Sequence, residues 1–98
     1  MGVNNVVYAW ARVTTTGTAL ASFGCTVART SAGNYRLTFT TAFGSANNIC
    51  AVASCRQSAG NYTATIAFYN TAYIDIETYN GTGTQVDCDF QVIVTGVR

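Results

Sequence analysis

The sequence contains no histidine, no lysine and no proline, and it has few charged residues of any kind. Charged side chains make up 9% of the 98 residues, against roughly 25% in an ordinary globular domain. The formal net charge is +1, and the five arginines are scattered along the chain. Because binding to a phosphate backbone needs clustered positive charge, we do not expect nucleic acid as a partner.

A long apolar run is also missing. No stretch approaches the roughly 20 residues that a membrane-spanning helix requires, and no charged segment followed by an apolar segment opens the chain in the manner of a secretion signal. Met1 and Gly2 do not begin a myristoylation motif, because Val6 stands where that motif needs Ser or Thr. We therefore expect neither membrane insertion nor a signal peptide.

Apolar residues, by contrast, are abundant, at 49% of the sequence. The length predicts one domain over residues 1–98. A domain of this size buries only about 60 to 65% of the surface of its unfolded chain. A subunit partner, a metal or disulfides would be the usual sources of further stabilisation.

Thr, Val, Tyr and Ile recur at alternate positions, which predicts β-strands rather than helices. In the clearest case, residues 34–41, Tyr35, Leu37 and Phe39 alternate with polar residues. The predicted strands are residues 6–14, 18–22, 24–30, 34–41, 49–57, 62–69, 73–79 and 85–95. Seven or eight short strands with frequent turns predict an all-β domain, either a small antiparallel β-sandwich or a small barrel.

Two predicted strands and two turns carry specific expectations. In residues 6–14 the alternation places Val7, Ala9, Ala11 and Val13 on one face and Tyr8, Trp10, Arg12 and Thr14 on the other. Phe23, Cys25 and Val27 occupy alternate positions, so we expect their side chains on one face. The tetrapeptide Ser-Ala-Gly-Asn occurs at residues 31–34 and again at residues 58–61, and its glycine and asparagine tolerate the positive φ of a tight β-turn.

Four carboxylates form two i, i+2 pairs: Asp75 with Glu77, and Asp87 with Asp89. Glycoside hydrolysis needs such a pair on either side of a sugar, and the same oxygens could bind a divalent cation weakly. We favour a solvated strand face whose charges discourage aggregation of strand edges. Without histidine or lysine we expect no enzyme, no metal and no cofactor.

The four cysteines, Cys25, Cys50, Cys55 and Cys88, contain no C-x-x-C pair, and no histidine is available to complete a zinc site. We expect buried free thiols that act as small apolar side chains; disulfides, the alternative, need an oxidising compartment. The odd spacing of Cys50 and Cys55 places them on opposite faces of a strand. A cysteine nucleophile would lack its histidine base.

Aromatic side chains occur together with amide and hydroxyl groups. Flat rings beside such groups suit sugars, which stack their C–H faces and hydrogen-bond through their hydroxyls. The same residues suit a subunit interface, where aromatic residues are enriched and charge is depleted. The residues concerned are Tyr8, Trp10, Tyr62, Tyr69, Tyr73, Tyr79, Asn47, Asn48, Asn61, Asn70 and Asn80.

Read together, residues 8–18, 33–42, 74–81 and 90–96 resemble the C-terminal domains of bacteriophage tail fibres. Those domains read A-W-V-N-F-x-G-T-G, G-x-Y-T-V-x-F-T-T-A-M, R-x-R-T-Y-N and V-x-V-x-V-F-G, in the same order and over nearly the whole chain. This chain departs from them at Ala11 and Arg12, which replace Val-Asn, at Phe43, which replaces Met, and at Thr95, which replaces the final aromatic residue.

The resemblance implies a β-sandwich that forms a homotrimer at the tip of a fibre and attaches the virion to a host surface polysaccharide or protein. It also implies assembly in the reducing host cytoplasm, which suits free thiols. A purely structural trimerisation or capping domain is the alternative, and a small glycan-processing enzyme is a more distant one. We expect receptor contacts from the loops 42–48, 70–72 and 80–83. The predicted contact residues are Phe43, Asn47, Asn48, Tyr69, Asn70 and Asn80.

Overall fold

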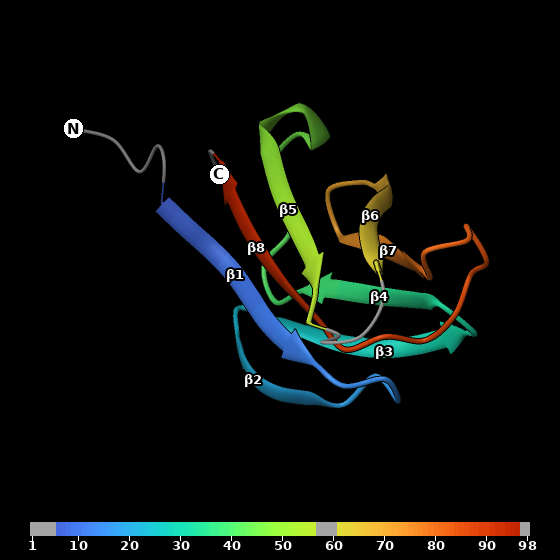
Figure 1. Ribbon diagram of the computed structural model, residues 1–98. Helices are drawn as coiled ribbons and strands as arrows, with labels where there is room; N and C mark the ends of the chain where they lie inside the picture. Colours follow the sequence, from blue (N-terminus) through green and yellow to red (C-terminus); the bar gives the residue numbers. More distant parts are fainter. Residues whose placement is uncertain (1–5, 57–60, 97–98) are drawn as a thin grey trace.

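The alternation of apolar and polar residues produces two antiparallel four-stranded sheets that pack face to face (Figure 1). The computed structural model describes residues 6–56 and 61–96. These residues form eight strands and one short 3₁₀ helix. The predicted all-β sandwich of seven to eight strands is thereby confirmed. No helix within the described part of the chain is long and apolar enough to cross a membrane.

The first sheet has the strand order β2-β1-β8-β5, and the second has the order β3-β4-β7-β6. The first comprises β1 (Val6–Val13), β2 (Ala19–Phe23), β5 (Ile49–Cys55) and β8 (Phe90–Gly96). The second comprises β3 (Cys25–Ser31), β4 (Asn34–Phe39), β6 (Thr63–Tyr69) and β7 (Tyr73–Tyr79). The helix η1 (Ala46–Asn48) precedes β5. The predicted strand 85–95 is shorter than expected, because residues 85–89 make only an isolated bridge, from Gln85 to Tyr79.

The core lies between the two sheets and is built from alternate residues of their strands. Tyr35, Leu37 and Phe39 of β4 point inward, as the sequence predicts. The ring of Tyr35 meets that of Phe90, from the opposite sheet, with 4.8 Å between centroids. Full burial of each large apolar side chain contributes about 2 kcal/mol. Core residues of the other strands include Ala9, Ala11, Val13, Cys25, Ile74, Ile76, Val92 and Val94.

A bulge in β1 changes the face on which two residues lie. Val7 pairs with Thr95 and Ala9 pairs with Val94, so Tyr8 is the extra residue between them. Tyr8 packs against the core, where its ring meets that of Phe43 edge to face, while Val7 is 41% exposed. The predicted two-face assignment is therefore wrong for Val7 and Tyr8, because a bulge shifts the period-two alternation by one residue. It is right for Ala9, Ala11, Val13, Trp10 and Arg12.

The chain passes from the first sheet to the second at Gly24. This residue has φ +72°, and a Cβ atom there would lie 2.2 Å from the carbonyl oxygen of Tyr8. Only glycine permits this turn beside a neighbouring backbone. Phe23 consequently ends β2 with 57% of its surface exposed, whereas Cys25 begins β3 and is buried. The expectation that Phe23 and Cys25 share one face of a strand is wrong, because the turn at Gly24 places them in different sheets.

Of the two repeated Ser-Ala-Gly-Asn turns, the first joins β3 to β4 as expected. Its Gly33 has φ +70°, and Ser31 pairs with Asn34 across the hairpin. The second turn, at residues 58–61, lies almost entirely outside the described residues.

Candidate functional site

The outward face of the first sheet carries a row of apolar side chains that crosses all four strands. Phe23 of β2 pairs with Trp10 of β1, Trp10 with Ile93 of β8, and Ile93 with Val52 of β5. Directly paired residues point to the same side of a sheet. Phe23, Ile93 and Val52 are 57%, 49% and 68% exposed, so much of each side chain is accessible to solvent. We call these four residues the apolar row.

A second row runs parallel to the first, two residues along each strand and thus about 6.6 Å away. It consists of Ala21, Arg12, Gln91 and Ser54, which are paired in that order. The Gln91 amide donates a hydrogen bond of 3.3 Å to the Ser54 hydroxyl. Arg12 is exposed and makes no hydrogen bond or ion pair with any residue in the described ranges. We call these four residues the polar row.

The members of the two rows that lie on β1, β8 and β5 line an open groove of about 730 Å³, which we call the outer groove. Sites for small molecules have volumes of about 300 to 1,000 Å³ and are mostly apolar, with a few polar groups that fix orientation. The sequence assigns Trp10 and Arg12 to one face but does not reveal the groove, because the pairing that brings Gln91 and Val52 beside them is non-local. The lining residues are Val7, Trp10, Ala11, Arg12, Val52, Ser54, Gln91, Val92 and Ile93.

The structure brings together two of the three loops in which we expect receptor contacts. The amide of Phe43 donates to the carbonyl of Thr71, so the start of loop 42–48 lies beside turn 70–72. Turn 80–83 follows Tyr79, at the other end of β7 from Asn70 and Tyr73. The predicted contact residues therefore do not form one site.

The side chains of these residues differ in what they can offer a ligand. Phe43 is 3% exposed and packs against Phe39 and Tyr8, so its ring contacts the core. The Asn70 side chain accepts hydrogen bonds from the amides of Ala72 and Tyr73, both at 2.9 Å. Asn80 does the same for its own turn, where its side chain accepts from the amides of Thr82 and Thr84.

Three predicted contact residues are more accessible. Asn47 is exposed and Asn48 half-buried, both within η1, and Tyr69 is 50% exposed at the end of β6. Their contact with a receptor stays a prediction.

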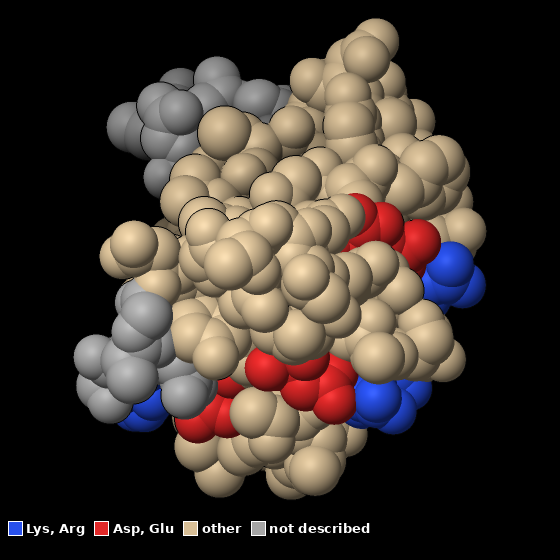
Figure 2. All heavy atoms as spheres, turned by 45° about the vertical axis from the view of Figure 1, so that its right-hand side comes forward, with Lys and Arg blue, Asp and Glu red and all other residues tan. Residues whose placement is uncertain are grey.

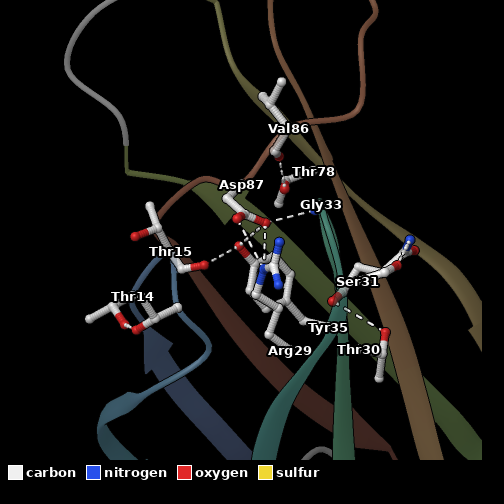
Figure 3. Close-up of polar contacts among 12 residues, drawn as sticks. Thr14, Thr15, Arg29, Thr30, Ser31, Gly33, Tyr35, Thr78, Val86 and Asp87 are labelled. Carbon is white, nitrogen blue, oxygen red and sulfur yellow. Dashed lines mark hydrogen bonds and ion pairs between the residues drawn. The ribbon is translucent and has the colours of Figure 1, made fainter.

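Asp87 is the centre of a polar cluster at one end of the sandwich (Figure 3). Its carboxylate accepts hydrogen bonds from the Gly33 amide at 2.7 Å, from the Tyr35 hydroxyl at 3.2 Å and from Arg29 Nε at 3.0 Å. The Tyr35 hydroxyl also lies 2.8 Å from the carbonyl oxygen of Thr15. We call Asp87, Arg29, Gly33 and Tyr35 the Asp87 cluster. It ties the β3–β4 hairpin to the segment that leads into β8.

The pKa values in this cluster follow from its contacts. The hydrogen bond from Arg29, together with those from Gly33 and Tyr35, holds the pKa of Asp87 below its ordinary value. Burial raises the pKa of Tyr35 to about 12. Asp87 is thus charged and Tyr35 neutral at neutral pH. Asp89, the other member of the predicted pair, accepts a hydrogen bond from the Thr15 amide at 2.8 Å.

The second predicted carboxylate pair lies on the outward face of the second sheet. Asp75 accepts two hydrogen bonds from Arg36, of 2.8 and 3.1 Å, and the guanidinium carbon of Arg36 lies 3.8 Å from the centre of the Tyr73 ring. Glu77 accepts a hydrogen bond from the Tyr79 hydroxyl. Figure 2 accordingly shows acidic and basic groups side by side on a surface that is otherwise uncharged. All four carboxylates accept a hydrogen bond from a neighbouring group of the same chain.

All four cysteines are free thiols. Cys25 and Cys88 are buried and Cys55 is half-buried, as expected, but Cys50 is exposed and corrects the expectation of four buried thiols. Cys50 and Cys55 do lie on opposite faces of β5. Burial and a hydrogen bond with Cys88 raise the pKa of Cys55 to about 12, so this thiol is protonated and unreactive at neutral pH.

Among residues 6–56 and 61–96, no group of three or more Asp, Glu, His or Cys side chains is placed to hold a metal ion. No family model, curated protein or solved structure matches this chain.

Proposed function

We propose that this chain is the tip domain of a bacteriophage tail fibre, which forms a homotrimer and attaches the virion to a polysaccharide or protein on the host surface. The outer groove is the observation that carries the proposal. It combines an indole ring, an arginine that has no acidic partner in the described part of the chain, and two hydrogen-bonding side chains on one sheet. Ligand sites typically combine apolar surface with a few such polar groups. The acidic side chains, in contrast, are engaged in holding the fold together.

The edges of the sandwich support the trimeric part of the proposal. Leu20 and Phe23, on edge strand β2, are 64% and 57% exposed, and Phe68 and Tyr69, on edge strand β6, are each 50% exposed. The pairs lie at opposite sides, because β2 packs near β3 while β5 packs near β6. Contact between one edge and the opposite edge of the next copy is head-to-tail, and such contacts close into a ring of three when successive copies are rotated by a third of a turn.

Light scattering after size-exclusion chromatography tests this assembly. We expect a mass of three times the 10.4 kDa of the chain, stable over a dilution series. Leu20→Ser and Phe68→Ser, each at an exposed position, should yield folded monomers. A folded wild-type monomer at all concentrations would contradict the assembly.

Competition with virions tests the attachment. The isolated domain, added to host cells before the phage, should block adsorption in proportion to its concentration. Three weak sites on one trimer reach useful strength through avidity, so the monomeric Leu20→Ser variant should block at least about tenfold less well. A trimer that leaves adsorption unchanged would favour a purely structural capping domain.

A further inference from the structure

The outer groove has the amphipathic pattern of a sugar chain. A pyranose ring has a flat C–H face that stacks on aromatic and apolar side chains and an edge of hydroxyls that form directional hydrogen bonds. The apolar row and the polar row run side by side across the same four strands. The groove is lined by residues of β1, β8 and β5, and with strands about 4.8 Å apart these three strands span about 10 Å. A short saccharide laid across the strands would contact both rows along its length.

The polar row still has unused hydrogen-bonding capacity. The bond between Gln91 and Ser54, at 3.3 Å, uses one amide N–H, so a second N–H, the amide oxygen and the hydroxyl proton of Ser54 remain for a ligand. Adjacent donors and acceptors of this kind match vicinal sugar hydroxyls.

Arg12 indicates the charge of the ligand. Arg29 and Arg36 pair with Asp87 and Asp75, whereas Arg12, beside Trp10 in the groove, has no acidic partner among the described residues. A guanidinium recognises a carboxylate through two parallel hydrogen bonds. The groove therefore has a position for one negative charge.

A second copy of this chain is a poorer occupant than an outside ligand. The sequence has only four Asp and Glu residues, and each already accepts a hydrogen bond within its own chain. A neighbouring copy would cover the apolar row but offer Arg12 no free side-chain carboxylate.

We propose that the outer groove binds an acidic saccharide, a chain of uronic acid units that stacks on Trp10, hydrogen-bonds to Gln91 and Ser54, and places a carboxylate on Arg12. The inference rests on the proposed attachment function, for which it names the ligand class and the binding residues.

The chain contains its own reporter for this site, because Trp10 is its single tryptophan. We would titrate the wild-type domain with a trisaccharide of galacturonic acid and follow the indole fluorescence. The methyl ester of the same trisaccharide, which keeps the rings and removes the charge, is the matched control ligand. We expect the indole fluorescence to change saturably with the acid trisaccharide. The methyl ester should bind about tenfold more weakly. No change with the acid, or equal binding of acid and ester, would overturn the proposal.

Variants test the named residues. Arg12→Gln should weaken binding of the acid about tenfold and leave binding of the ester unchanged. Arg56→Gln is the control, since Arg56 is also exposed but does not line the groove. Trp10→Ala, measured by calorimetry because it lacks the fluorophore, should lose about tenfold, and Trp10→Phe should recover part of this loss. Equal affinities of Arg12→Gln and Arg56→Gln, or unchanged binding by Trp10→Ala, would place the ligand elsewhere.

Two further results separate this inference from the attachment function. If Trp10→Ala converts the trimer into monomers, a second copy occupies the groove and the inference is overturned. If the wild-type domain blocks virion adsorption but does not bind the acid trisaccharide, attachment stands and the acidic ligand is wrong. If it binds the acid through Trp10 and Arg12 but does not block adsorption, the ligand stands and the attachment function fails.

Discussion

The Asp87 cluster and the outer groove contain similar residue types, but these residues have different roles in the two regions. Each contains an arginine, an aromatic ring and neutral hydrogen-bonding groups. In the Asp87 cluster, Arg29, Tyr35 and the Gly33 amide all converge on one carboxylate. In the outer groove, Arg12 and Trp10 lie next to exposed apolar side chains, and none of the described residues offers Arg12 a carboxylate.

This difference separates residues that hold the fold from residues available to a ligand. A polar group that is satisfied within the chain has little further capacity, and its loss leaves partners unsatisfied. An exposed group without a partner contributes little to the free energy of folding. Substitutions in the Asp87 cluster should therefore change stability, and substitutions of the exposed side chains of the outer groove should change binding alone.

The largest effect on stability should come from Gly33→Ala. The new Cβ would lie 2.9 Å from the Thr78 carbonyl oxygen and 2.5 Å from Gln85 Cγ, at a residue with φ +70°. We expect the free energy of unfolding to fall by about 3 kcal/mol, as measured by urea denaturation. Gly83→Ala is the matched control, since Gly83 has φ +87° but open space around it, and it should cost about 1 kcal/mol. Equal losses would show that the hairpin is not held against residues 78–86.

Asp87→Ala should cause the second-largest loss of unfolding free energy, because it removes the common hydrogen-bond acceptor of the cluster. The Gly33 amide and the Tyr35 hydroxyl lose this carboxylate partner, and we expect a loss of about 2 kcal/mol in urea denaturation. Asp87→Asn, which keeps one acceptor oxygen, should lose less. A loss below about 0.5 kcal/mol, the usual range for surface substitutions, would contradict a structural role for Asp87.

The free energy of unfolding at acid pH should also depend on the carboxyl group of Asp87. The pKa of Asp87 is lower in the folded chain than its ordinary value, chiefly through Arg29, so its stabilising contribution is complete above the unfolded pKa of about 4. As pH falls below that value and through the folded pKa, the contribution is lost. Unfolding followed by circular dichroism between about pH 6 and pH 2 should therefore show a steeper loss for the wild type than for Asp87→Asn. If the wild type and Asp87→Asn lost stability equally as the pH falls, Asp87 would not be the source of the acid sensitivity.

The smallest effect on the free energy of unfolding should come from an exposed residue of the outer groove. Ile93→Thr keeps a β-branched side chain at an exposed position, and we expect unfolding free energy to change by no more than about 0.5 kcal/mol. Its neighbour Val94 is fully buried, so Val94→Thr should cost about 2 kcal/mol. Thermal unfolding of the two variants side by side tests the contrast. A large loss for Ile93→Thr would mean that the apolar row is covered in the assembled protein.

Local patterns in the sequence predict most of the strands. The strand Tyr73–Tyr79 is predicted with its observed ends, and Ile74 and Ile76 lie in the core. The misplaced residues are those where one backbone conformation resets the alternation, at the β1 bulge around Tyr8 and at the turn of Gly24. A bulge is set by pairing with a distant strand, so the local pattern does not contain it.

The candidate site is less predictable for the same reason. The sequence associates Trp10 with Arg12, two residues apart, but Gln91 and Ser54 join them only through the pairing of β1, β8 and β5. Composition indicates aromatic and amide groups suited to sugars and does not say which of them meet. The side-chain hydrogen bonds that commit Asn70 and Asn80 to their own turns also depend on turn conformation.

The position of β8 determines when the outer groove, the proposed binding site, can form. β8 follows the other seven described strands along the chain, lies between β1 and β5, and supplies the middle of both rows. Until it is synthesised and inserted, β1 and β5 have no common neighbour and the groove does not exist. Such long-range pairing is slow to form. The proposed saccharide site therefore forms in one late step rather than gradually, and a nascent chain that stops before residue 90 contains the other seven described strands but not the outer groove.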